Sequence, residues 1–121
     1  MIKTVKGVLR GLGYAAEGYA GAFREDVHFR INFTLSLLGT ALSLIFLNGC
    51  LKLTVALVNW LVLAFELINT AVERAVDTAT REISPTAKLS KDASAAAVLT
   101  VGIFALLCDL FILLPEILRR L

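Results

Sequence analysis

The chain has 121 residues, of which 58% are hydrophobic and 18% charged, and its mean hydropathy is +0.80. This composition excludes an ordinary soluble domain and indicates a small integral membrane protein. The formal net charge of +2 is too small to favour a nucleic-acid partner. We therefore expect a single all-α integral membrane domain over residues 1–121, with any active site built largely from membrane helices.

The first segment, 1–26, mixes basic and apolar residues and is predicted to form an amphipathic helix at the membrane surface. Its basic residues include Lys3, Lys6, Arg10 and Arg24. Glycines in the same stretch weaken the case for one unbroken helix.

Three apolar stretches follow, and we expect transmembrane helices over about 30–48, 51–77 and 91–115. A spanning helix needs about 20 mostly apolar residues. The second stretch is apolar only as far as Phe65, so its helix must continue through the acidic residues beyond. Pro85 interrupts the helical structure between the second and third predicted helices.

The basic residues also predict the orientation in the membrane. Lysines and arginines in the first segment and in the 78–92 connection place both in the cytoplasm. Arg119 and Arg120 then fall on the outer side, which conflicts with the excess of Lys and Arg expected in cytoplasmic segments. The larger number of basic residues in the other two segments decides the prediction. We expect a cytoplasmic N-terminus and an outer C-terminus.

Four polar residues, Glu66, Asn69, Glu73 and Asp77, form a stripe on the second predicted span. At about 100° per residue they lie within about 80° of one another. An ionised carboxylate inside a bilayer is costly, so such residues face a protein interior or a wet cavity and are functional candidates. Contacts between helices, or a proton or ion relay, are the alternatives. Four polar residues in register favour a catalytic or transport site.

A second charged cluster lies at residues 88–94, "KLSKDAS". Lys91 suits a phosphate oxygen, and Asp92 can orient it or accept a ribose hydroxyl; the alternative is a cytoplasmic anchor for the third span. Glu25 and Asp26 form a third acidic group. Together these residues are typical of phosphoryl transfer, with carboxylates for Mg²⁺, a lysine for phosphates and an acid as base. The glycine motifs of P-loop proteins and protein kinases are missing from the sequence.

The segments "ELINTAVERAVD" (66–77) and "AKLSKDASAAAVL" (87–99) resemble the bacterial membrane diacylglycerol kinase family, which includes the undecaprenol kinases. The first matches every fixed position of the family pattern E-[IVL]-x-N-[ST]-A-[IV]-E-x-x-V-D. Ser90 replaces the usual alanine before Lys91 and Asp92. The resemblance covers nearly the whole chain. It implies a homotrimer of three-span subunits in the bacterial cytoplasmic membrane, with active sites between subunits that use MgATP to phosphorylate a membrane lipid alcohol.

The resemblance also implies roles for single residues. Glu66 would be the general base for the lipid hydroxyl, Asn69 would help position that site, and Glu73 would hold the Mg²⁺ bound to ATP. Asp26 would be the second metal ligand, with Glu25 as the alternative. The further nucleotide contacts would be Tyr14, Glu82, Ile83, Ser84, Lys91 and Asp92.

Some assignments stay open at this point. The segments "INTAVE", "SPTAK" and "ILLPEI" favour undecaprenol as acceptor, while "GYAAEGY" and "SAAAVL" favour diacylglycerol, and we expect undecaprenol slightly ahead. Asp109 lies outside the family pattern and could pair across a trimer or sit near the outer interface. The competing class is a small ion- or proton-coupled membrane protein, against which Lys91 and Asp92 and the full register of the stripe argue.

Overall fold

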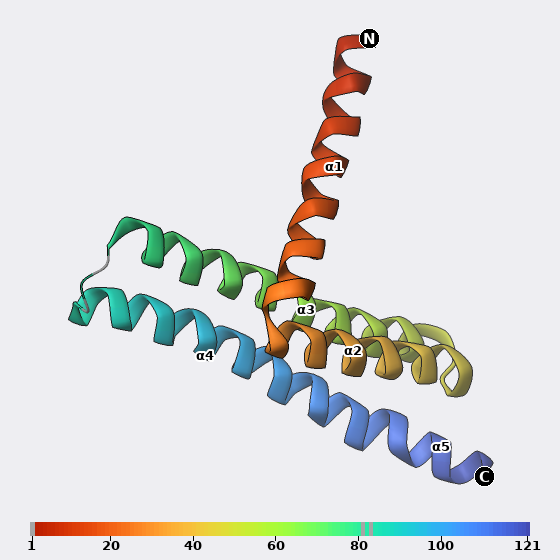
Figure 1. Cartoon of the computed structure of the whole chain (residues 1–121). Coiled ribbons are helices and arrows are strands. Elements are labelled where there is room, and N and C mark those ends of the chain that lie inside the picture. The colour runs from red at the N-terminus through yellow and green to blue at the C-terminus, as the bar shows by residue number, and fades with distance from the viewer. Residues whose placement is uncertain (1, 81, 83) are drawn as a thin grey trace.

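The computed structural model describes residues 2–80, 82 and 84–121. The regular elements in this part of the chain are helices: α1 (Ile2–Glu25), α2 (Val27–Phe46), α3 (Gly49–Ala79), α4 (Pro85–Cys108), the π-helical turn η1 (Asp109–Leu113) and α5 (Leu114–Arg120). Helix α3 packs against both α2 and α4. Figure 1 shows these three helices running alongside one another, while α1 leaves them at a steep angle.

Three helical stretches are long and apolar enough to cross a membrane: Val27–Phe46, Gly49–Ala79 and Pro85–Arg120. This confirms the predicted all-helical fold with three apolar helices, and the chain is a membrane protein. The third stretch begins six residues earlier than expected, because the Ser84 side chain accepts the Ala87 N–H at 3.1 Å and Pro85 occupies the first turn.

The π-helical turn η1 joins α4 to α5 without a break in the helical path. Leu114 N–H donates to the carbonyl of Asp109, five residues back. Pro115 has no N–H, and its ring would collide with the carbonyl of Phe111 in a regular helix. This proline accounts for the wider turn.

Helix α1 is continuous through its glycines. At Gly7, Gly11, Gly13 and Gly18 an added Cβ would meet open space, so packing does not require glycine at these positions. A glycine inside a helix costs about 1 kcal/mol relative to alanine, which is tolerable. The placement of α1 on a membrane surface stays a prediction.

Asp26 separates α1 from α2 and caps the second helix. Its backbone is extended (φ −110°, ψ 116°), and its Oδ1 accepts the N–H groups of His28 at 2.8 Å and Phe29 at 3.2 Å. The end of α1 is held on α2 by edge-on aromatic pairs, including Tyr19 with Phe29 at a centroid distance of 6.0 Å. The last turn of α1 is thereby placed beside α3.

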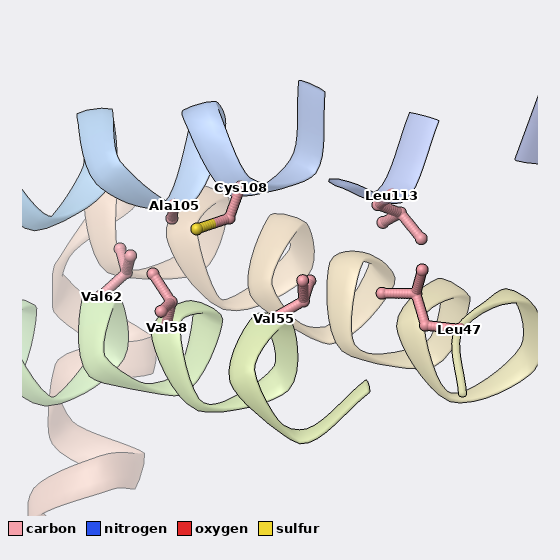
Figure 2. Packing of buried hydrophobic residues seen from close by; sticks show 7 residues of the cluster. All are labelled: Leu47, Val55, Val58, Val62, Ala105, Cys108 and Leu113. Carbon is pink, nitrogen blue, oxygen red and sulfur yellow. The ribbon is translucent and has the colours of Figure 1, made fainter. Parts of the chain in front are cut away.

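Helix α3 is one rod of 31 residues, because neither glycine nor proline interrupts it after Gly49. At 1.5 Å per residue it is about 46 Å long. Its apolar half packs on the other helices through a cluster of buried residues, shown in Figure 2: Leu47, Val55, Val58, Val62, Ala105, Cys108 and Leu113. Its polar half carries the predicted acidic stripe.

Candidate active site

An open cleft of about 770 Å³ lies where the end of α1 meets α2, α3 and α4. Its lining includes five carboxylates, from Glu25, Asp26, Glu66, Glu73 and Asp77. All five come from segments that the sequence singled out separately, the acidic stripe and the end of the first segment. The fold brings them to one place because Asp26 ends α1 directly beside α3.

Glu66 occupies the most buried position among these acids, with only 3% of its surface exposed. The hydroxyl of Thr70 lies 3.0 Å from the backbone carbonyl of Glu66 and 3.0 Å from Asp26 Oδ2, and its single hydrogen can serve either. Thr70 therefore links the two acidic segments. A carboxylate that is removed from bulk water yet lines a cleft can take a proton from a hydroxyl brought to it.

Asn69 connects α4 to Glu73 through its side-chain amide. Ser94 Oγ on α4 donates to Asn69 Oδ1 at 2.7 Å, and Asn69 Nδ2 donates to Glu73 Oε1 at 3.2 Å. Asn69 is buried, with 8% of its surface exposed. The chain of contacts fixes which way the amide points and so holds one oxygen of the Glu73 carboxylate.

The two lysines of the second cluster pair with different acids. Lys91 Nζ lies 2.6 Å from Asp77 Oδ1, which joins the start of α4 to the end of α3. Asp92 pairs instead with Lys88, one turn earlier on α4, at 3.2 Å. Both pairs are substantially exposed, so each contributes little to stability. In this arrangement Asp92 does not orient Lys91.

The cleft offers oxygen donors of the kind that Mg²⁺ prefers. Among the described residues no group of three or more His, Cys, Asp or Glu side chains is placed to hold a metal ion. Mg²⁺ bound to a nucleotide is usually held by one or two carboxylates together with the phosphates, so it does not require such a group. Of the two candidates near the end of α1, Glu25 Oε2 is paired with Arg74 at 2.7 Å, while Asp26 caps α2.

We expect substitutions of Asp26 to separate its capping role from a role at the metal. Asparagine caps helices as well as aspartate, whereas alanine costs about 1 kcal/mol. Asp26→Asn should keep the thermal stability in detergent micelles and weaken the dependence of activity on Mg²⁺, and Asp26→Ala should lower both. If Asp26→Asn leaves the Mg²⁺ dependence unchanged, Glu25 becomes the candidate ligand.

Several predicted nucleotide contacts lie apart from the cleft. Tyr14 is exposed on α1, and Glu82 is exposed in the connection between α3 and α4. Ser84 caps α4, and Ile83 falls outside the described residues. The nucleotide roles of these residues and of Asp92 stay predictions.

The structure adds residues that the sequence reading did not assign to the site. Thr70, Arg74 and Ser94 hold the acids in place, and His28 and Asn32 line the cleft from α2. A helical projection would have found Thr70 and Arg74, since they lie four and eight residues beyond Glu66, on nearly the same face. Ser94 depends on how α4 docks against α3, which no local pattern gives.

Fold and cleft together define a small membrane protein of three apolar helices with an acid-lined cleft on the polar half of α3. The profile of prokaryotic diacylglycerol kinases matches residues 13–113. The chain belongs to the prokaryotic diacylglycerol kinase family.

Three relatives are similar over much of the chain. A diacylglycerol kinase of Synechocystis sp. is 39% identical over 107 residues, covering 87% of this chain and 61% of the relative. An undecaprenol kinase of Bacillus subtilis is 33% identical over 70 residues, covering 51% and 57%. A diacylglycerol kinase of Pseudomonas aeruginosa is 35% identical over 95 residues, covering 77% and 76%. The chain thus spans about three fifths of the length of the first two.

Proposed function

We propose that the protein is an integral-membrane lipid kinase that transfers the γ-phosphate of ATP to the hydroxyl of a membrane lipid alcohol. The observation that carries this proposal is the buried Glu66, which opens on a cleft lined by four further carboxylates. Membership of the prokaryotic diacylglycerol kinase family supports it.

In the proposed reaction Glu66 takes the hydroxyl proton of the lipid as its oxygen attacks the γ-phosphorus. The bond from that phosphorus to the β,γ-bridging oxygen breaks, and ADP leaves. Thr70 links Asp26 to the helix that carries the acidic stripe, and Asn69 holds Glu73 within the stripe. This chain would contribute to catalysis by keeping bulk water away from the base and by orienting the reacting groups.

Mg²⁺ is the proposed cofactor, held by Glu73 with Asp26, or Glu25 in its place, together with the phosphates of ATP. When bound it would neutralise charge on the transferring phosphate. Lys91 would add a positive charge at the same end of the cleft, since it already contacts the cleft acid Asp77.

The setting of the enzyme is the bacterial cytoplasmic membrane, with α1 on its cytoplasmic surface and a homotrimer as the assembly. The exposed apolar side chains along α2 and α4 suit lipid or neighbouring subunits, for example Leu35, Leu38, Ile103 and Phe104. For the acceptor, undecaprenol is proposed slightly ahead of diacylglycerol, and relatives named for each are similar to this chain.

The test is a mixed-micelle assay with γ-labelled ATP and Mg²⁺, in which undecaprenol and a diacylglycerol are offered at equal surface concentration. Label in either lipid supports the kinase, and the ratio of the two kcat/KM values identifies the acceptor. No label in either lipid, from protein shown to be folded, would overturn the proposal and favour an ion- or proton-coupled function for the acidic stripe.

A further inference from the structure

A polar contact between α3 and η1 lies outside the acid-lined cleft. Asn59 is buried, with 4% of its surface exposed. Its side-chain Nδ2 donates to Asp109 Oδ1 at 3.2 Å and to the backbone carbonyl of Val55 at 3.1 Å. Asp109 begins η1. Both hydrogens of the amide are therefore used, and one of them ties two membrane helices together.

Helix α2 closes over the same amide. A Cβ added to Gly39 would lie 2.8 Å from Asn59 Oδ1 and 2.9 Å from Asn59 Nδ2, distances too short for any real contact. The backbone of α2 thus rests directly on the Asn59 side chain. Gly39, Asn59 and Asp109 form one junction of three helices, which we call the Asn59 junction.

Among the described residues, the Asn59 junction is one of three polar side-chain contacts that join α3 to the continuous helical stretch of α4 and η1. The others are Asp77 with Lys91, and Asn69 with Ser94. Between membrane helices lipid is as apolar as the side chains, so apolar packing alone specifies the register weakly and polar pairs matter more. The pair of Lys91 and Asp77 is largely exposed to solvent and therefore weak, which leaves the part-buried Asn59 junction as the contact outside the cleft.

We propose that Asn59 and Asp109 are positioning residues: they fix the register of α4 on α3 and so hold Ser94 against Asn69, which in turn orients the Glu73 carboxylate. Ten residues of α3 separate Asn59 from Asn69, about 15 Å along a continuous helix. Because α3 and α4 are both continuous between the two contacts, a change of register at Asn59 and Asp109 also displaces Ser94 relative to Asn69. The activity readout of this inference rests on the whole proposed lipid-kinase function, whereas its binding readout rests only on the nucleotide site of that proposal.

The experiment compares Asp109→Leu, Asp109→Asn, Ser94→Ala and the double variant Asp109→Leu with Ser94→Ala. Asparagine at 109 keeps an oxygen acceptor for Asn59, so it is the matched control. Two quantities are measured in micelles: kcat and KM for MgATP with the lipid that the parent phosphorylates, and the Kd of a fluorescent ATP analogue with Mg²⁺.

Asp109→Leu should lower kcat/KM for MgATP at least about five-fold and weaken nucleotide binding, while Asp109→Asn stays within about two-fold of the parent. If the two sites act through one register, the double variant should be no worse than the more damaging single variant. Parent-like behaviour of Asp109→Leu, equal losses for the leucine and asparagine variants, or losses that multiply in the double variant would each overturn the proposal.

Should Asp109→Leu fail to fold, Gly39→Ala replaces it, because the added methyl displaces the Asn59 amide from the α2 side. The same non-additivity with Ser94→Ala is expected, and a multiplicative loss would again contradict the inference. A parent protein that binds the nucleotide analogue but labels no lipid would count against the proposed function alone, since the binding comparison among the variants still decides the positioning role.

Discussion

Glu66→Gln should reduce the turnover of lipid phosphorylation by about 10²- to 10⁴-fold while leaving the Kd for MgATP close to that of the parent. Glutamine keeps the size of the side chain and its ability to accept a hydrogen bond, but it cannot take the hydroxyl proton. Because Glu66 is buried, replacing its carboxylate by a neutral amide should not cost stability. The measurements are kcat in mixed micelles and nucleotide binding by fluorescence.

Glu17→Gln is the matched control for this prediction. Glu17 is exposed on α1 and is outside the cleft, so the same chemical change there should leave turnover within about two-fold, as for most surface substitutions. Near-normal turnover of Glu66→Gln would remove Glu66 as the base, and a matching loss of nucleotide binding would indicate a role in binding instead.

Glu73→Gln should weaken the apparent affinity for Mg²⁺ by about ten-fold or more, with part of the turnover restored at high Mg²⁺. The expected cause is the loss of one anionic oxygen ligand. Glutamine can still accept the Asn69 N–H that now reaches Glu73 Oε1, so the fold of the stripe should persist. The measurement is the rate as a function of free Mg²⁺ at a fixed concentration of MgATP.

Asp77→Asn makes the same change of charge one turn further along α3. Asp77 is paired with Lys91, so we expect its substitution to alter nucleotide affinity and to leave the Mg²⁺ dependence unchanged. An unchanged Mg²⁺ dependence in Glu73→Gln, or an equal shift in both variants, would argue that Glu73 is not a ligand of the metal.

The sequence predicted those features that depend on one helix at a time. The length of α3 follows from the lack of helix breakers, and its acidic face follows from residue spacing alone. Features that depend on docking were out of reach. Lys91 pairs with Asp77, and Ser94 reaches Asn69, because of the rotation and register of α4 on α3.

The direction of α1 relative to the other helices likewise could not be predicted from local sequence patterns. A single extended residue, Asp26, sets the angle between α1 and α2, and small changes in its two backbone dihedrals swing the whole of α1. Figure 1 shows that α1, the helix that carries Tyr14, points away from the others. Asp109 accepts a hydrogen bond from Asn59 of the same chain, a partner that its sequence position did not indicate.

The length of α3 predicts that the proposed activity is sensitive to bilayer thickness. A helix of about 46 Å exceeds a hydrocarbon core of about 30 Å, so its polar half extends beyond the core. A rod without a hinge meets a thicker or thinner bilayer by tilting or by sliding along its axis, unless the lipid deforms around it. Either motion moves Glu66, Glu73 and Asp77 together relative to the lipid headgroups. Turnover in vesicles of short-, medium- and long-chain phosphatidylcholines should therefore pass through a maximum, and a flat profile would mean that the surrounding lipid deforms to follow the protein.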